Sequence, residues 1–136
     1  MSNTREITFR AKIKNAKNFA YGSNMEGIGN FDLKTFFKAI ATGHLIENTL
    51  SEYTGFKYKN KIEIFEGDIL NHCFMDSCPN KKGIVKNVNG CWMIKAAGTN
   101  KYRPLCNIDG WVSLEDYPYD LEVIGNIYEN PELITN

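Results

Sequence analysis

Polar and apolar residues alternate near the start of the chain, in the pattern of a half-buried strand. Within residues 5–14, polar or charged side chains separate apolar ones at Ile7, Phe9, Ala11 and Ile13. The intervening positions include Arg10 and Lys12, so we expect this strand to turn a basic face outward. Residues 15–18 form a turn signal, and Phe19–Tyr21 is expected to be the return strand of a hairpin.

One short helix is predicted, over about residues 33–42. The period changes there to three and four, with apolar side chains at Leu33, Phe36, Phe37 and Ile40. Asp32 is a suitable N-cap, because its carboxylate can accept from the free amides of the first turn. Gly43 is expected to end the helix. The preceding stretch 22–30, rich in glycine and asparagine, is expected to be a loop.

Short strands and turns are predicted for the rest of the chain. Residues 45–54 are expected to form a strand or extended link that Gly55 ends. Glu63–Phe65 is interpreted as a short turn that buries apolar side chains. Glu66–Asp68 is interpreted as a tight turn in which Gly67 takes a positive φ.

Hairpin signals follow this turn. Asn89-Gly90 is typical of a type I′ turn, which needs a positive φ at both residues. Pro104 cannot donate to a ladder, so its strand is expected at a sheet edge. The expected strands are 68–74, 84–88, 91–95, 102–108 and 120–128, with residues 109–114 ambiguous and a one-turn helix at Asn130-Pro131. These patterns predict a mainly β protein with a small, partly open barrel in its second half.

Length and charge limit the function classes. The 136 residues fit one domain, 1–136, with an N-terminal strand and helix part at 1–52 and a hairpin-rich part at 53–134. The formal net charge is zero, which argues mildly against a nucleic-acid binder. Residues 1–22 carry five basic side chains and one acidic, whereas residues 104–136 carry seven acidic and no basic ones. The two ends could pair across strands or subunits, or the basic end could face an anionic partner.

The sequence gives no sign of a membrane association. Its first residues are polar and alternating rather than apolar, and no apolar run reaches the length of a membrane span. We therefore expect a cytoplasmic protein.

The cysteines do not follow the spacing of a zinc site. They are Cys73, Cys78, Cys91 and Cys106, and no second close pair follows the first two. In a reducing compartment they are most simply free thiols, and a disulfide between Cys73 and Cys78 would need an oxidant. We expect neither a bound metal nor a cofactor.

Few residues suggest catalysis. Glu66 and Asp68 form a carboxylate pair around Gly67, but such turns commonly bond their own backbone. His44 and His72 have no evident partner in the sequence. We therefore predict a non-enzyme and assign no catalytic, cofactor or metal residues.

Four segments of the chain, in order, resemble the YopX protein family. They are Arg5–Ala11 (REITFRA), Tyr53–Leu70 (YTGFKYKNKIEIFEGDIL), Gly83–Ile94 (GIVKNVNGCWMI) and Asp120–Ile134 (DLEVIGNIYENPELI). The chain departs from the family pattern in the second segment, where Lys61 follows Asn60 without the usual glycine and the usual Leu, Asp and Tyr are replaced by Phe56, Tyr58 and Phe65. The resemblance implies a mainly β fold with an SH3-like barrel element. It also implies a phage or prophage protein with no established activity and no catalytic residues to transfer.

Two function classes remain beside the enzyme. The first is a non-enzymatic binding or assembly module, expected to be a homo-oligomer, with Trp111, Tyr117 and Tyr119 at an interface or in the core. The alternative is a nucleic-acid-binding module that uses a basic barrel surface with Lys57, Lys59, Lys61, Lys81, Lys82 and Lys86. A solvated surface is the commoner role for such lysines in a chain of zero net charge.

Overall fold

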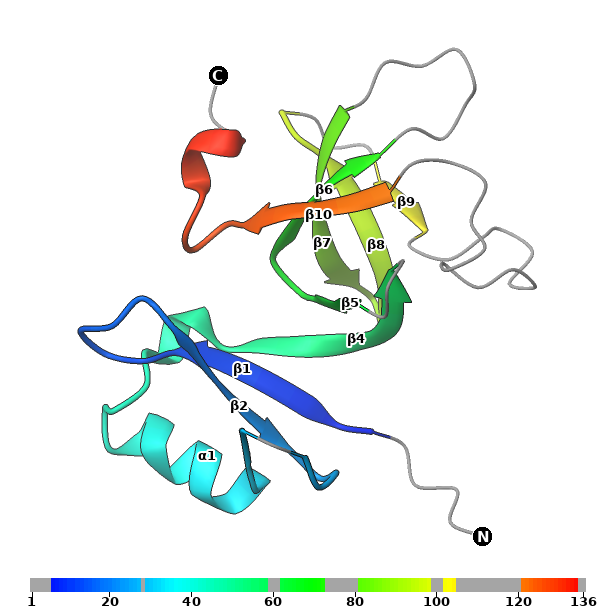
Figure 1. Ribbon diagram of the computed structural model, residues 1–136. Helices are drawn as coiled ribbons and strands as arrows, with labels where there is room; N and C mark the ends of the chain where they lie inside the picture. Colours follow the sequence, from blue (N-terminus) through cyan, green and yellow to red (C-terminus); the bar gives the residue numbers. More distant parts are fainter. Residues whose placement is uncertain are drawn as a thin grey trace, which may run out of the picture. The chain divides into compact units, whose positions relative to one another are not determined.

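The computed structural model describes residues 6–27, 29–58, 62–72, 81–98, 102–104 and 121–134. These residues form ten strands in two five-stranded sheets and one α-helix (Figure 1), which confirms the prediction of a mainly β fold. The chain divides into two compact units, Met1–Tyr53 and Thr54–Asn136. The division falls inside strand β4 (Ser51–Tyr58).

The first unit is built on an antiparallel hairpin of β1 (Thr8–Lys12) and β2 (Phe19–Ser23). The short strand β3 (Asn30–Phe31) pairs in parallel with β2, and the start of β4 pairs with β1. The helix α1 (Leu33–Ala41) lies along the hairpin (Figure 1). A 3₁₀ turn, Glu47–Thr49, leads from the helix segment into β4. The full strand order of this sheet is β3-β2-β1-β4-β5, where β5 spans Ile62–Phe65.

The helix begins and ends much as its sequence predicts. Asp32 is the N-cap, and its carboxylate Oδ1 accepts a hydrogen bond of 2.7 Å from the Thr35 N–H. The helix ends at Ala41, one residue earlier than predicted, with Thr42 as the C-cap. Gly43 follows the cap with a φ of +82°, the left-handed conformation that commonly terminates helices.

The core of the first unit depends on a close approach between helix and sheet. Phe36 is 1% exposed and packs with the buried Ala11, Ala20 and Leu45. A Cβ at Gly22 in β2 would lie 2.5 Å from both Cβ and Cγ of Phe36. Gly22 therefore lets the helix approach the sheet because it has no side chain.

The expected basic outer face of β1 is wrong at Arg10. Arg10 is only 7% exposed, and its Cζ lies 4.5 Å from the centroid of the Phe19 ring. The Nζ of Lys12 lies 5.8 Å from the same centroid. In the β1–β2 register Phe19 is opposite Lys12, so one ring is shared by two cations on the same strand face. The Phe19 ring thus takes the place of water beside the Arg10 and Lys12 cations.

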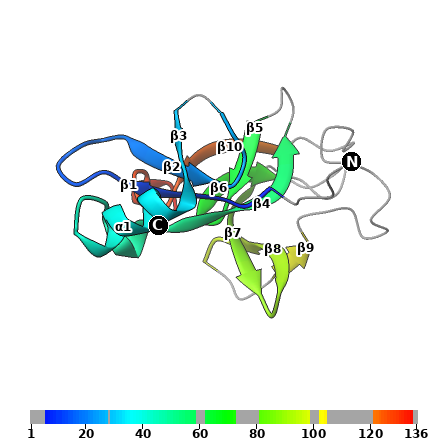
Figure 2. The ribbon, with the colours of Figure 1, turned by 90° about the horizontal axis from the view of Figure 1, so that it is seen from below.

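The second unit contains an antiparallel sheet of order β10-β6-β7-β8-β9. Figure 2 shows β7, β8 and β9 side by side. The strands are β6 (Asp68–His72), β7 (Lys81–Val88), β8 (Cys91–Ala96), β9 (Tyr102–Pro104) and β10 (Leu121–Asn126), and a one-turn 3₁₀ helix, Pro131–Leu133, follows. The strand with Pro104 is at the sheet edge, as predicted, and Asn89 and Gly90 have positive φ values of 53° and 85°.

Two boundaries in the middle of the chain differ from the sequence prediction. Strand β4 does not end at Gly55 but passes through it to Tyr58, with a φ of +87° at the glycine. The predicted turn Glu63–Phe65 is instead part of a strand, β5 (Ile62–Phe65). Its apolar residues are nevertheless buried as expected, with Ile64 0% and Phe65 2% exposed.

The inner face of the second sheet packs into one core. Leu70, Val85 and Ile94 come from three neighbouring strands and pack with Ile64, supported by Phe56, Trp92 and Val123. Strands β10 and β9 are the two ends of this sheet, so the described strands do not close into a barrel. Assignment to the SH3-like class stays a prediction, and residues 109–114 lie outside the described residues.

The close approach at Gly22 can be tested by adding one methyl group. We expect Gly22→Ala to lower the free energy of unfolding by about 1–3 kcal/mol, because Phe36 cannot withdraw without moving the helix. Gly27→Ala is the matched control, since its nearest neighbour is the end of the Asn30 side chain at 3.0 Å. Urea denaturation of both variants measures the difference. Equal stability would contradict the close-packing argument.

The Asp32 cap gives a pH-dependent prediction. The Thr35 backbone hydrogen bond lowers the pKa of Asp32 below its usual 3.8, so the ionised carboxylate stabilises the folded state. This contribution is complete above the unfolded pKa and is lost as pH falls through the lower folded pKa. Asp32→Ala should therefore unfold at lower temperature near neutral pH, and its difference from wild type should shrink in acid. Asp32→Asn, which keeps a neutral acceptor, should cost less stability than Asp32→Ala near neutral pH, and its difference from wild type should also shrink in acid.

Candidate functional site

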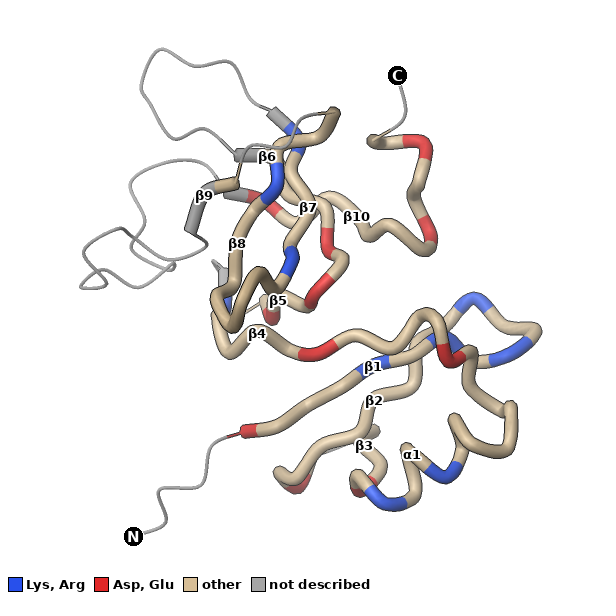
Figure 3. Tube along the Cα trace, turned by 180° about the vertical axis from the view of Figure 1, so that it is seen from behind, with Lys and Arg blue, Asp and Glu red and all other residues tan. Residues whose placement is uncertain are grey.

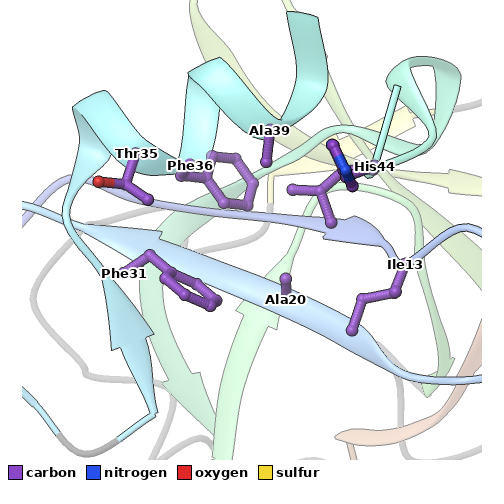
Figure 4. Close-up of a pocket in the computed structure, with 8 residues that line it drawn as sticks. Ile13, Ala20, Phe31, Thr35, Phe36, Ala39 and His44 are labelled. Atoms are coloured by element: carbon purple, nitrogen blue, oxygen red, sulfur yellow. The ribbon is translucent and has the colours of Figure 1, made fainter. Parts of the chain in front are cut away.

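An apolar pocket in the first unit lies between α1 and β2 (Figure 4). Its volume is about 210 Å³, and the atoms exposed on its wall are apolar. The wall consists of Ile13, Ala20, Phe31, Thr35, Phe36, Ala39, His44 and Leu45. Figure 4 shows that strand residues form one side and helix residues the other. The pocket can accept an apolar group without leaving a buried polar atom unpaired.

The ends of the helix position this wall. Phe31 and Phe36 occupy the positions before the N-cap and in the second turn, the arrangement known as a hydrophobic staple. At the other end, the backbone N–H groups of His44 and Leu45 both donate to the Ala39 carbonyl, at 2.9 and 3.2 Å. Residues at both ends of the helix therefore contribute to the pocket wall. The staple spacing is visible in the sequence, but the spacing alone does not indicate a pocket.

Phe31 is an exposed part of the pocket wall. It is 52% exposed, although it is a large aromatic residue on an edge strand. The same side chain also lines a second hollow of about 300 Å³, formed by Ser23–Gly27 and Asn30–Asp32. Met25 in this second hollow is 40% exposed. An exposed aromatic and a methionine beside an apolar pocket are typical of a protein-binding surface.

The carboxylate turn at Glu66–Asp68 lies in the second unit and is bonded to backbone. Asp68 is 2% exposed, and its Oδ2 accepts a hydrogen bond of 2.9 Å from the Phe65 N–H. Gly67, with a φ of +87°, donates to the Val85 carbonyl and accepts from the Ile127 N–H, each at 2.9 Å. The turn therefore connects β6 and β7 with the segment after β10.

A second turn, after β10, is bonded around Asn126. The Asn126 Oδ1 accepts from the N–H groups of Tyr128 and Glu129, at 3.1 and 2.9 Å. Its Nδ2 donates to the Glu129 side chain at 2.8 Å, and Asn130 Oδ1 accepts from the Asn126 N–H at 3.2 Å. This turn supplies the Ile127 that bonds Gly67. Two of the segments that resemble the family pattern thus meet at one backbone hydrogen bond.

The histidines and cysteines do not come together in the described structure. His44 is exposed, and its Nδ1 shares a hydrogen bond of 2.8 Å with Thr42 Oγ1. His72 ends β6, but its side chain lies outside the described residues. Cys91 is a free, exposed thiol, whereas the remaining cysteines, Cys73, Cys78 and Cys106, lie outside the described residues. Within the described ranges, no group of three or more His, Cys, Asp or Glu side chains could hold a metal ion.

The remaining candidates divide between described and undescribed residues. Lys57, Lys82 and Lys86 are exposed on strands of the second unit. Outside the description lie Lys59 and Lys61, the side chain of Lys81, and the aromatic residues Trp111, Tyr117 and Tyr119. None of the helices in the described part is long and apolar enough to cross a membrane.

The protein is mainly β. Two of the segments that resemble the family pattern, 53–70 and 120–134, are joined by the hydrogen bond between Gly67 and Ile127. Residues 8–135, nearly the whole chain, match the sequence model of the YopX protein family. The chain therefore belongs to the YopX protein family. No curated protein matches it.

A solved structure of similar fold comes from Enterococcus faecalis. The crystal structure of protein EF1440 superposes with a TM-score of 0.52 and 22% sequence identity. The match covers 95% of this chain and 98% of the other. At this identity the likeness concerns the fold alone.

Single substitutions distinguish the contributions of Asp68 and Glu66 to stability. We expect Asp68→Ala to lower the free energy of unfolding by about 1–3 kcal/mol, because the buried Phe65 N–H loses its acceptor. Glu66→Ala, in the same turn but only half-buried, should change stability by less than about 0.5 kcal/mol. Chemical denaturation of both variants makes the measurement. Equal effects of the two substitutions would argue against the bond from Phe65 to Asp68 as the cause.

Proposed function

We propose that this protein is a non-enzymatic binding or assembly module of a phage or prophage, acting in the cytoplasm. The observation that carries the proposal is the apolar pocket beside the exposed Phe31. The atoms exposed on its wall are apolar, which suits an apolar side chain, and the imidazole of His44 in the wall is bonded through Nδ1 to Thr42 Oγ1. We assign the pocket to a bulky apolar side chain of a protein partner.

The size of the pocket supports a protein anchor over a small-molecule substrate. Its volume of about 210 Å³ lies below the range of about 300–1,000 Å³ that is usual for small-molecule sites. A single anchoring side chain is the common unit of recognition at protein interfaces, where a few buried groups carry most of the affinity. The exposed Phe31 and Met25 would then form the surface around the anchor.

The carboxylate turn supports the same reading. Asp68 is buried and accepts from a backbone N–H, which gives it a structural role. The enzyme hypothesis therefore gains no residue from this turn. We also propose that the protein forms a homo-oligomer, which light scattering would test by giving a multiple of the chain mass.

Two alanines of α1 provide a matched test of the pocket. Ala39 lines the pocket, whereas Ala41 is exposed elsewhere on the same helix. Ala39→Leu should fill the pocket and weaken partner binding by more than about tenfold, the effect of losing an anchor residue. Ala41→Leu adds the same atoms and should leave binding unchanged.

The measurement uses cells that carry the prophage. Tagged wild-type protein and both variants would be purified, and co-purified proteins identified by mass spectrometry. A partner recovered with wild type and Ala41→Leu, but lost with Ala39→Leu, is then titrated as a purified protein. Equal retention by all three proteins would reject the pocket as the binding site.

A further inference from the structure

The outer face of the β7–β8–β9 strands carries a cluster of lysines that the strand register brings together. Residues directly opposite one another in an antiparallel pair share a sheet face. Ile84 pairs with Lys95, and Lys95 pairs in turn with Tyr102. Lys82 and Lys86 flank Ile84 at two residues' distance, so they lie on the same face. We call Lys82, Lys86, Lys95 and Tyr102 the β7–β9 face.

The alternation along β7 and β8 supports this assignment. Val85 and Ile94, opposite one another in the register, are buried in the core of the second unit. Their neighbours Lys86 and Lys95 therefore point to the other side. Lys82 and Lys86 are exposed, Lys95 is half-buried, and Tyr102 is 40% exposed. The face is thus accessible in the described structure.

The three lysines are close enough to act on one polyanion. Diagonal neighbours on paired strands have side chains about 7–8 Å apart, and Lys95 is diagonal to both Lys82 and Lys86. Salt screens charges over about 8 Å at physiological ionic strength, so lysines at this spacing attract one polyanion together. Figure 3 shows these basic positions on β7 and β8.

The nearest described acid on this face is at the opposite edge of the sheet. Glu122 in β10 pairs with Asn71, which pairs with Lys82. It therefore lies two strands from Lys82, about 10 Å away. The described face has three cations and one anion, although the net charge of the whole chain is zero. Among the described residues of this sheet face, positive charge therefore predominates.

Tyr102 adds a different kind of contact. An exposed aromatic ring beside cations can stack on a nucleobase, and this stacking tolerates any base. A base is free to stack only when it is outside a duplex. The combination of lysines and a ring therefore favours single-stranded nucleic acid over a duplex.

We propose that the β7–β9 face binds single-stranded nucleic acid, with Lys82, Lys86 and Lys95 contacting phosphates and Tyr102 stacking on a base. This surface lies in the second unit and is separate from the apolar pocket of the first. The proposal therefore does not depend on the pocket's function.

Fluorescence anisotropy with a labelled single strand of about 12 nucleotides tests the proposal. Three phosphate contacts predict a slope of about −2 for log affinity against log salt, and a roughly twentyfold loss between about 50 and 200 mM salt. DNA and RNA strands of one sequence show which sugar is preferred, and the matching duplex should bind more weakly.

Substitutions distinguish binding by the β7–β9 face from binding that depends on positive charge elsewhere on the protein. The triple variant Lys82→Gln, Lys86→Gln, Lys95→Gln should lose the binding, and Tyr102→Ala should weaken it by about tenfold without changing the salt slope. The matched control is Lys14→Gln, Lys17→Gln, Lys34→Gln, which removes three exposed lysines of the first unit and should have no effect. If the triple variant does not fold, each single substitution should reduce the slope by about 0.7.

Cys91 supplies a readout in the unmodified protein. It pairs with Val88 and so lies on the same outer side of β8 as Lys95. Its exposed free thiol should be alkylated more slowly when a single strand is bound, as measured on the peptide that contains it.

Three results would overturn the proposal. The first is no binding of a single strand at the lowest salt. The second is an equal loss in the control triple variant. The third is full affinity in Tyr102→Ala together with equal competition by polyglutamate, which would mark a general polyanion surface. Loss confined to the β7–β9 face variants and protection of Cys91 would support it.

Discussion

The backbone of Gly67 is the point on which the second unit depends. Its N–H and carbonyl both bond at 2.9 Å, to Val85 in β7 and to Ile127 after β10. Its φ of +87° is a conformation that other residues rarely adopt, and a Cβ there would lie 3.1 Å from the Tyr128 ring. One residue thus ties the start of β6 to β7 and to the segment that follows β10. This arrangement brings the last strand of the chain beside the first strand of the sheet.

The first unit is organised by a comparable constraint. Gly22 allows the Phe36 ring to reach the sheet, and the helix termini fix the direction of α1. The apolar pocket is a consequence of this arrangement, since Phe36 fills only part of the space between helix and hairpin. The surface most suited to binding therefore arises where packing brings two elements together and leaves a side chain's volume open.

Two surfaces of opposite chemistry thus lie in two separate units. The pocket of the first unit is apolar, whereas the β7–β9 face of the second is basic with an exposed ring. Arg10 and Lys12 belong to neither, because both cations lie near the Phe19 ring. The basic N-terminal segment is therefore a poorer candidate for an anionic partner than its composition indicates. The proposed protein site and the proposed nucleic-acid site would together suit an assembly role.

The sequence alone determined the local structure wherever one residue type fits one backbone conformation. Asp32 at the helix start, Gly67 in its turn and Asn89-Gly90 in the hairpin were predictable for this reason. The mainly β class followed from the alternation of apolar residues. The strand through Gly55 was missed, because a glycine that permits a turn also permits a positive φ within a strand.

Only the tertiary structure decided which residues share a surface. The staple pair Phe31 and Phe36 was visible as a spacing, but the pocket also needs Ile13, Ala20 and Leu45 from other elements. The proposed basic face likewise needs Lys95 and Tyr102 to be placed by strand register, whereas the sequence drew attention to lysines that are close along the chain. Backbone preferences act within a few residues and can be recognised in one sequence. Pockets and charged faces arise from pairing between distant segments, which burial and hydrogen bonding fix only when the chain has folded.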